Sequence, residues 1–311
     1  MKAAVIHEFG APEVFKYEDV PKPEAGAGEV LIKVHAAGIN PVDWKTRQSG
    51  GIMKANGIPL PYILGWDVSG VIEQVGAGIT DFTVGQAVYG LVRFPAMGSA
   101  YAEYVSAPAS EIAAKPTSID HIHAAALPLA ALTAWQALFE HAHLEAGQRL
   151  LVQGAAGGVG HLAVQIAKAH GAQVIGTASA RNGDYLREIG VDEVVDYQAV
   201  RYEDMIHDVD VLFETVSGAN SERVLKTIKA GGVLVTCAGL PAAEILAQYD
   251  LRTERFLVRP EASQLAEITT LIDAGKVKPN VDAVFPLAEA GKAQALGEQG
   301  HTRGKIVLQI V

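Results

Sequence analysis

Residues 149–171 have the sequence RLLVQGAAGGVGHLAVQIAKAHG, and this stretch decides the fold of the chain. Arg149 to Gln153 is a short apolar run that predicts a buried strand of about five residues. Glycines follow at positions 154, 157, 158 and 160, and apolar side chains then recur at helical spacing from Val159 to Ala167. A strand, a glycine turn and a helix without a spacer are typical of the first half of a dinucleotide-binding βαβ unit.

The glycines of this turn have a physical reason. A pyrophosphate binds against the free N–H groups that open a helix, and a β-carbon in the turn would hold the phosphate away. We expect Gly154 and Gly157 to allow the tight turn, Gly158 the close approach of the phosphate, and Gly160 the close packing of helix on strand. The alternative is a glycine-rich loop that only turns the chain.

The end of the second expected strand, Gln173 to Ala178, indicates which dinucleotide binds. An NAD site places an Asp or Glu about 20 residues after the glycines to hold the ribose 2′-OH. Here Ser179 and Arg181 follow the strand, and Asp184 comes only later. A hydroxyl and a guanidinium both bind phosphate, so these residues predict the 2′-phosphate of NADP. The alternative is that Arg181 is a solvated loop charge.

Composition limits the possible classes of protein. The chain has 311 residues, of which 49% are hydrophobic and 19% charged, as expected for two globular domains. The net charge of −10 argues against general binding to nucleic acid or anionic membranes. The one cysteine excludes an intramolecular disulfide and a cysteine-rich zinc site. We see neither a signal peptide nor an apolar run of roughly 20 residues, and therefore expect a cytoplasmic protein.

The order of the expected elements predicts an α/β protein. Residues 1 to about 120 contain short strands separated by Gly and Pro clusters, which is typical of a β-rich barrel domain. Two alanine-rich helical segments follow at 119–128 and 130–143, with a break at Pro128. Strands then alternate with helices, which predicts a doubly wound parallel sheet of the Rossmann type. We expect these strands at 150–153, 174–178, 193–196, 209–213, 233–236 and 255–258, the helices between them at 158–170, 183–189, 199–207, 219–229 and 241–249, and later a helix at 264–273 and a strand at 305–311.

Several phrases in this order resemble the medium-chain dehydrogenase/reductase superfamily, and within it the zinc-independent NADPH quinone oxidoreductases. They are KAAVIHEFGAPEVFKYEDVPKPEAGAGEVLIKVHAAGINPVDWKTRQSG, LGWDVSGVIEQVGAGITDFTVGQAVYG, AYAEYVSAP, AALPLAALTAWQAL, GAAGGVG and HTRGKIVL. The resemblance implies a GroES-like catalytic domain at residues 1–120, completed by about 265–311, and a Rossmann NADP-binding domain at residues 121–264.

The same resemblance bears on metal binding. Where the zinc alcohol dehydrogenases of the superfamily carry a Cys and a His as ligands, this chain has Asn40 and Trp66. The remaining histidines show no paired ligand spacing, and His121 and His123 would point apart on a helix. We therefore expect no metal.

Without a metal to polarise a carbonyl, hydride transfer favours a substrate that is already electrophilic. The sequence thus predicts an NADPH-dependent, zinc-independent oxidoreductase that reduces quinones or the activated C=C bonds of α,β-unsaturated carbonyl compounds. One alternative is an enoyl-thioester reductase, and another is an NADPH-binding structural or sensor protein with little turnover. We expect a small-molecule substrate, no nucleic acid, no membrane and a homodimer.

The resemblance also places individual residues. Asn40, Asp43 and Lys45 would border the nicotinamide pocket, where Asn40 would contact the ribose or the substrate and Lys45 would stabilise an oxyanion. Alternatively, Asp43 and Lys45 form a structural ion pair or are solvated charges. The expected contacts to NADP(H) are Asn40, Thr133, Gly154, Ala155, Gly157, Gly158, Val159, Ser179, Arg181, Tyr197, Val216, Ala238, Gly239 and Lys305, with Ser217 beside Val216.

Overall fold

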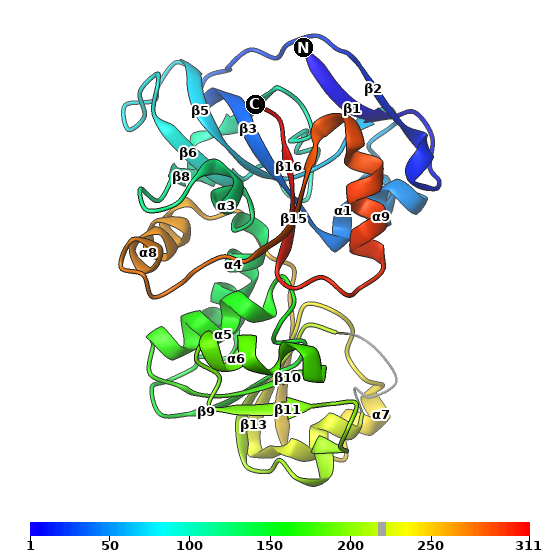
Figure 1. The fold of residues 1–311 in the computed structure, drawn as a ribbon, viewed down its shortest axis with the longest axis vertical. Coiled ribbons are helices and arrows are strands. Elements are labelled where there is room, and N and C mark those ends of the chain that lie inside the picture. Colours follow the sequence, from blue (N-terminus) through cyan, green and yellow to red (C-terminus); the bar gives the residue numbers. More distant parts are fainter. Residues whose placement is uncertain (217–221) are drawn as a thin grey trace. The chain divides into compact units, whose positions relative to one another are not determined.

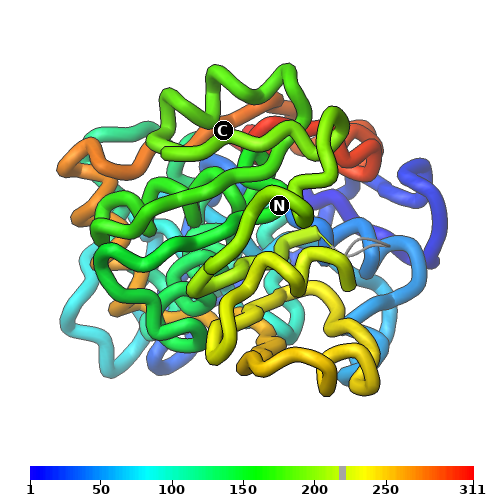
Figure 2. The backbone as a smooth tube through the Cα atoms, turned by 90° about the horizontal axis from the view of Figure 1, so that it is seen from below, coloured from blue at the N-terminus to red at the C-terminus, as the bar shows by residue number. Residues whose placement is uncertain are grey.

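A computed structural model describes residues 1–216 and 222–311 of the chain (Figure 1). The chain divides into two compact units. The first unit comprises Met1–Leu132, Arg259–Asp273 and Pro279–Val311, and the second comprises Thr133–Val258 and Ala274–Lys278. The backbone of the second unit can be followed in green and yellow in Figure 2.

The sheet of the second unit is parallel and doubly wound. Within the described residues it has six strands in the order β11-β10-β9-β12-β13-β14. The order reverses between β9 and β12, which is the point where open α/β sheets bind ligands. The expected Rossmann sheet is therefore confirmed. Its strands are β9 (Arg149–Val152), β10 (Gln173–Ala178), β11 (Glu193–Asp196), β12 (Val209–Glu214), β13 (Ile228–Thr236) and β14 (Leu251–Arg255).

Two expected helices of this unit are only short 3-10 segments. The segment predicted at 199–207 is helical only at Tyr202–Asp204, because its apolar anchors Tyr202 and Ile206 span a single turn. The segment predicted at 219–229 is helical at Arg223–Thr227, and its first part lies outside the described residues. The last strand ends at Arg255 instead of beginning there, since Leu251–Arg255 pair with Gly232–Thr236 of β13. The other helical segments are α5 (Gly160–Ala169), α6 (Gly183–Glu188), α7 (Ala243–Leu246), a 3-10 turn at Ala180–Asn182 and a π-helical turn at Gln136–His141.

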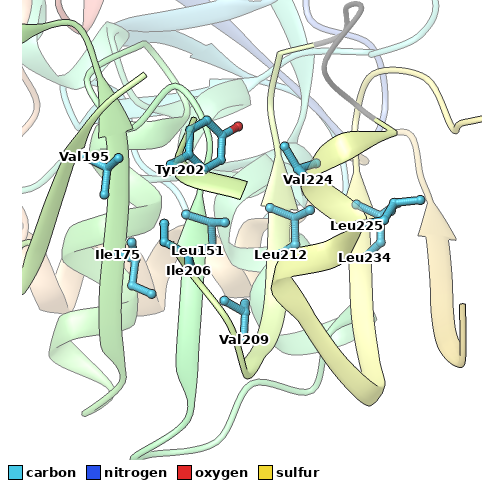
Figure 3. Packing of buried hydrophobic residues seen from close by; sticks show 10 residues of the cluster. All are labelled: Leu151, Ile175, Val195, Tyr202, Ile206, Val209, Leu212, Val224, Leu225 and Leu234. Atoms are coloured by element: carbon cyan, nitrogen blue, oxygen red, sulfur yellow. The ribbon is translucent and has the colours of Figure 1, made fainter. Parts of the chain in front are cut away.

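The core on one face of this sheet is built from neighbouring strands. Leu151, Ile175, Leu212 and Leu234 come from β9, β10, β12 and β13, and Figure 3 shows them side by side. Tyr202 and Ile206, together with Val224 and Leu225, close the cluster. Fully burying each such side chain stabilises the fold by about 1.5–3 kcal/mol. This packing fixes the carboxyl ends of the strands, where the glycine turn begins.

The first unit is built on antiparallel strands. Within the described residues, seven strands form one sheet in the order β15-β16-β3-β5-β6-β8, and β7 also pairs with β3. The terminal strand β16 pairs antiparallel with β3, so that Ile306 lies opposite Ile39. The strands are β3 (Glu29–Ile39), β5 (Asp67–Val75), β6 (Ala87–Leu91), β7 (Tyr104–Pro108), β8 (Ile112–Ala114), β15 (Val281–Pro286) and β16 (Lys305–Gln309), and a smaller sheet holds β2 (Phe15–Asp19), β1 (Lys2–Ile6) and β4 (Tyr62–Ile63).

Two helices of the chain, α1 and α4, begin at a proline. Pro41 opens α1 and Pro128 opens α4, and a proline costs nothing there because the first N–H of a helix has no partner. The sequence had not indicated β15 or α9, because their short, weakly patterned segments give little periodicity. The helices are α1 (Pro41–Ser49), α2 (Gly51–Ala55), α3 (His121–Ala125), α4 (Pro128–Trp135), α8 (Ala262–Asp273) and α9 (Ala290–Glu298). Across the described part of the chain, no helix has both the length and the apolar character to cross a membrane.

Candidate functional site

The glycine turn of the second unit connects β9 to α5. Gly154 has a φ of +64°, which favours glycine, and its carbonyl accepts the N–H of Gly157 at 2.9 Å. A β-carbon on Gly160 would lie 2.2 Å from that carbonyl oxygen, so only glycine fits there. A β-carbon on Gly157 would meet nothing closer than 3.2 Å. The turn therefore requires glycine for its own shape at 154 and 160, whereas at 157 a β-carbon would require only a small shift of the Gly154 carbonyl.

Backbone N–H donors directly follow Gly157 in this turn. Among the described residues, the amides of Gly158 and Val159 donate no hydrogen bond, and they lie directly before the first residue of α5. Unpaired amides at a helix N-terminus attract phosphate, since the helix dipole adds positive potential there. Ala155, in the same turn, is fully buried and donates its N–H to the carbonyl of Thr177 at 3.0 Å. The two unpaired amides, of Gly158 and Val159, thus fit a pyrophosphate.

The residues expected to bind the 2′-phosphate lie at the end of β10. Ser179 is partly exposed and accepts a backbone hydrogen bond from Asn182, and Arg181 is exposed. The N–H of Tyr197 donates to the carbonyl of Ala178 at 3.3 Å, so the structure brings Tyr197 to this strand end. Asp196 pairs with Ala178 in the sheet register, which places a carboxylate there that sequence reasoning had not considered.

Other expected cofactor residues follow further strands of the same sheet. Val216 comes after β12 and is exposed, and a β-carbon on Gly154 would lie 2.8 Å from it. Ala238 donates its N–H to the hydroxyl of Thr236 at 2.9 Å, and a β-carbon on Gly239 would meet nothing within 4 Å. Thr133 is buried in α4. Ser217 lies outside the described residues.

The first unit contains a buried polar network around Asn40, the residue before α1. The side-chain amide of Asn40 donates to Oδ2 of Asp67 at 2.8 Å. The ammonium of Lys305 donates to Oδ1 of Asn40, to the carbonyl of Ile39 at 2.8 Å and to Oδ2 of Asp67 at 3.4 Å. All of these side chains are buried. Lys305, which the resemblance had placed at the cofactor, is therefore held by three acceptors within the first unit.

Asp43 and Lys45 lie differently on α1. Asp43 is fully buried and accepts the N–H of Asn40 at 2.6 Å and the hydroxyl of Tyr101 at 2.8 Å. Burial raises the pKa of Asp43 to about 7, although these two hydrogen bonds act in the opposite direction. Lys45 is exposed. No ion pair joins the two residues in the described structure, and Asp43 is buried rather than solvated. Its hydrogen bond from the N–H of Asn40 holds the turn at the start of α1.

Comparison with known proteins finds relatives that match nearly the whole chain. Residues 26–117 match the family model of the alcohol dehydrogenase GroES-like domain, and residues 189–308 match that of the zinc-binding dehydrogenases. The chain is 36% identical over 318 residues to the chloroplastic NADPH-dependent alkenal/one oxidoreductase of Arabidopsis thaliana, covering 99% of this chain and 79% of the relative. It is 36% identical over 325 residues to the quinone oxidoreductase of Rattus norvegicus, covering 98% of this chain and 96% of the relative.

The chain belongs to the medium-chain dehydrogenase/reductase superfamily. Within this superfamily it is of the zinc-independent quinone oxidoreductase type. The solved structure of the quinone oxidoreductase from Coxiella burnetii agrees, with a TM-score of 0.91 and 35% identity over 100% of this chain and 99% of that chain. The resemblance read from the sequence phrases is confirmed.

In this medium-chain dehydrogenase/reductase, Asn40 and Trp66 stand where the resemblance implies zinc ligands, and Oδ1 of Asn40 accepts from the ammonium of Lys305. The indole N–H of Trp66 donates to the carbonyl of Ala96 at 2.6 Å, and its ring packs edge-on against Phe94. His121 contacts Ser69 and His123 contacts Asp120, so they face different partners. Among the described residues there is no group of three or more His, Cys, Asp or Glu side chains suited to a metal.

Two further acids of this medium-chain dehydrogenase/reductase were missed in the sequence. Asp67 follows Trp66 directly, and its contact with Lys305 depends on the pairing of β16 with β3. Glu214 ends β12 directly after Phe213, which pairs with Val152 of β9 at the point where the strand order reverses. Burial raises the pKa of Glu214 to about 7, and neither of its carboxylate oxygens has a hydrogen-bond partner among the described residues. An acid that ends a central strand is the sequence signal that would have found Glu214.

Proposed function

We propose that this protein is an NADPH-dependent, zinc-independent oxidoreductase that reduces quinones or the activated C=C bonds of α,β-unsaturated carbonyl compounds. The glycine turn carries the cofactor assignment, because Gly158 and Val159 present unpaired amides before α5 and Ser179 and Arg181 follow β10. The activities named for the Arabidopsis and rat relatives support the choice of acceptor.

NADPH, when bound, supplies the hydride. The residues of this chain bind and orient it. The amides at the start of α5 stabilise the pyrophosphate, and Ser179 and Arg181 bind the 2′-phosphate by charge-assisted hydrogen bonds. The remaining cofactor contacts that the resemblance implies, at Thr133, Ala155, Tyr197, Val216, Ala238 and Gly239, belong to this proposal.

The acceptor needs stabilisation of the negative charge that develops on its oxygen during hydride transfer. A quinone or enone is already electrophilic, so its reduction proceeds with hydrogen-bond donors in place of a metal. Asn40 has a side-chain N–H, and Lys45 has an exposed ammonium further along α1. We assign both to the oxygen, with Asp43 holding the backbone of Asn40 and water supplying the proton.

The proposal is tested by following NADPH oxidation with a panel of quinones, alkenals, cyclic enones and enoyl thioesters. A saturated ketone of matched size is the control acceptor. We expect turnover with quinones or enones, none with the saturated ketone, and a preference for NADPH over NADH. Turnover with enoyl thioesters alone would indicate the acyl reductase, and binding of NADPH without turnover on any acceptor would indicate a sensor.

Assembly and location are also proposed. Similar proteins commonly form homodimers, and we expect the same in the cytoplasm for this chain. Light scattering of the purified protein measures its mass in solution, and fractionation of the source cells locates it. A monomeric mass, or recovery with membranes, would contradict these expectations.

A further inference from the structure

The side-chain amide of Asn40 is held from both sides. Its nitrogen donates to Oδ2 of Asp67 at 2.8 Å, and its oxygen accepts from the ammonium of Lys305. Rotating the amide by half a turn would place NH₂ against the ammonium and the oxygen against the carboxylate. The orientation of Asn40 is therefore determined by the charges of its two neighbours.

Those neighbours are themselves fixed. Lys305 uses its three ammonium protons on Asn40, Asp67 and the carbonyl of Ile39. Asp67 receives three donors, since the N–H of Leu129 reaches its Oδ1 at 2.7 Å. Three donors and no acceptor suit the carboxylate form. Neither Lys305 nor Asp67 retains a group with which to bind a substrate or cofactor.

Asn40, in contrast, retains a group with which it can bind a ligand. Its backbone N–H is used by Asp43, and its amide oxygen faces the ammonium. A side-chain amide has two N–H donors, and only one of those on Asn40 has a partner among the described residues. The buried residue thus keeps one N–H donor without a partner among the described residues, and no comparable acceptor. Asn40 can therefore donate to an oxygen of a ligand, but it cannot accept the hydrogen of a ribose hydroxyl through its amide oxygen.

We propose that Lys305 and Asp67 are positioning residues that orient Asn40, and that Asn40 donates its remaining N–H to the substrate carbonyl oxygen during hydride transfer. The inference rests on the proposed function. With an enone, the hydride forms a C–H bond at the β-carbon, the π electron pair moves to the oxygen as an enolate, and a proton from water adds at the α-carbon. NADPH is oxidised to NADP⁺ as the C=C bond is reduced. The N–H of Asn40 stabilises the charge on the oxygen.

The sharpest test exchanges the two side chains, as Asn40→Asp combined with Asp67→Asn. The exchange conserves shape and total charge, keeps an acceptor for Lys305 at position 40 and for Leu129 at position 67, and removes the remaining N–H donor of residue 40. We expect kcat with a cyclic enone to fall about tenfold to a hundredfold, the loss of a hydrogen bond to a charged group. The Kd of NADPH and the melting temperature should stay close to wild type.

A second variant covers the case in which the exchanged protein does not fold. Asn40→Ala removes the donor and adds no charge, so it should lower kcat by a similar factor with little change in KM. Lys305→Met should also lower kcat, because the amide of Asn40 is then free to turn. In the Asn40→Ala background, Lys305→Met should lower kcat no further, since a positioning residue has nothing left to position.

A control variant removes another ion pair of the same unit, in which Arg47 is buried and Glu298 is partly exposed. Arg47→Met combined with Glu298→Gln removes a contact between α1 and α9 and leaves Asn40 untouched. We expect a lower melting temperature with kcat retained. Equal losses of kcat in the control and the exchange variant, unchanged kcat in the exchange variant, or independent effects of Lys305 and Asn40 would each overturn the inference. Failure of the wild type itself to reduce any quinone or enone would overturn the proposed function instead.

Discussion

The hydroxyl of Tyr101 donates a 2.8 Å hydrogen bond to Oδ2 of Asp43, and neither side chain is exposed to solvent. Burial raises the pKa of Asp43 from 3.8 to about 7. The folded protein therefore binds a proton at a pH at which the unfolded chain has lost it. The contribution of this proton to the free energy of unfolding is complete at low pH and is lost as the pH rises from about 4 to about 7.

Asp43→Asn should remove this dependence. One titrating group changes the free energy of unfolding by at most about 1.4 kcal/mol per pH unit within the window. In urea titrations at pH 5, 6 and 7, we expect the stability of the wild type relative to Asp43→Asn to increase toward pH 5. Asp81→Asn, at an exposed carboxyl of the same unit, is the control. A difference that is constant with pH would contradict the assignment.

The glycine turn predicts different results for the same substitution at two positions. Gly157→Ala should lose little stability, since its β-carbon would lie 3.2 Å from the carbonyl oxygen of Gly154. It should weaken NADPH binding at least tenfold, because the added methyl group directly precedes the unpaired amides of Gly158 and Val159. Gly160→Ala should lower stability by about 2 kcal/mol or more, since its β-carbon would lie 2.2 Å from the carbonyl oxygen of Gly154. Melting temperatures and calorimetric titrations distinguish the two. Equal NADPH affinity in wild type and Gly157→Ala would mean that phosphate binds elsewhere.

Cofactor choice should depend on the end of β10. Arg181→Ala should lower the affinity for NADPH about tenfold to a hundredfold, which corresponds to the loss of a hydrogen bond to a charged group. The affinity for NADH should stay nearly unchanged. Ser179→Asp should shift the cofactor preference further toward NADH, because a carboxylate repels the 2′-phosphate and accepts a hydrogen bond from a ribose 2′-OH. Arg187→Ala, at an arginine that pairs with Asp184 on α6, is the control. If Arg181→Ala weakens both cofactors equally, Arg181 does not bind the 2′-phosphate.

The metal prediction rests on Asn40 and Trp66. Because the indole N–H of Trp66 is donated to Ala96 and an indole offers no lone pair, the purified protein should contain no stoichiometric zinc. NADPH oxidation should survive prolonged treatment with EDTA. One zinc per chain by elemental analysis, with activity that is lost on chelation and restored by zinc, would disprove this prediction.

The sequence predicted the features whose residues lie close together in the chain. The strand, glycine turn and helix at 149–171 are contiguous, so local patterning was sufficient to find them. The network around Asn40 was not predictable in this way, since Lys305 is 265 positions away and reaches Asn40 only because β16 pairs with β3. The resemblance implied a cofactor contact for Lys305, and the contacts of its ammonium with Asn40 and Asp67 became apparent only from this pairing.

Glu214→Gln should remove a pH dependence of NADH binding. Glu214 ends β12 directly after Phe213, which pairs with Val152 of β9 where the strand order reverses, and its pKa of about 7 means that its charge changes near neutral pH. An ionised carboxylate there repels the pyrophosphate, so the wild type should bind NADH less tightly as the pH rises from 6 to 8, by roughly threefold or more. NADH is the right probe because the 2′-phosphate of NADPH has its own second pKa near about 6. Glu193→Gln, at an exposed residue that begins β11, should retain the wild-type dependence. Identical pH profiles for wild type and Glu214→Gln would show that this carboxyl does not act on the cofactor.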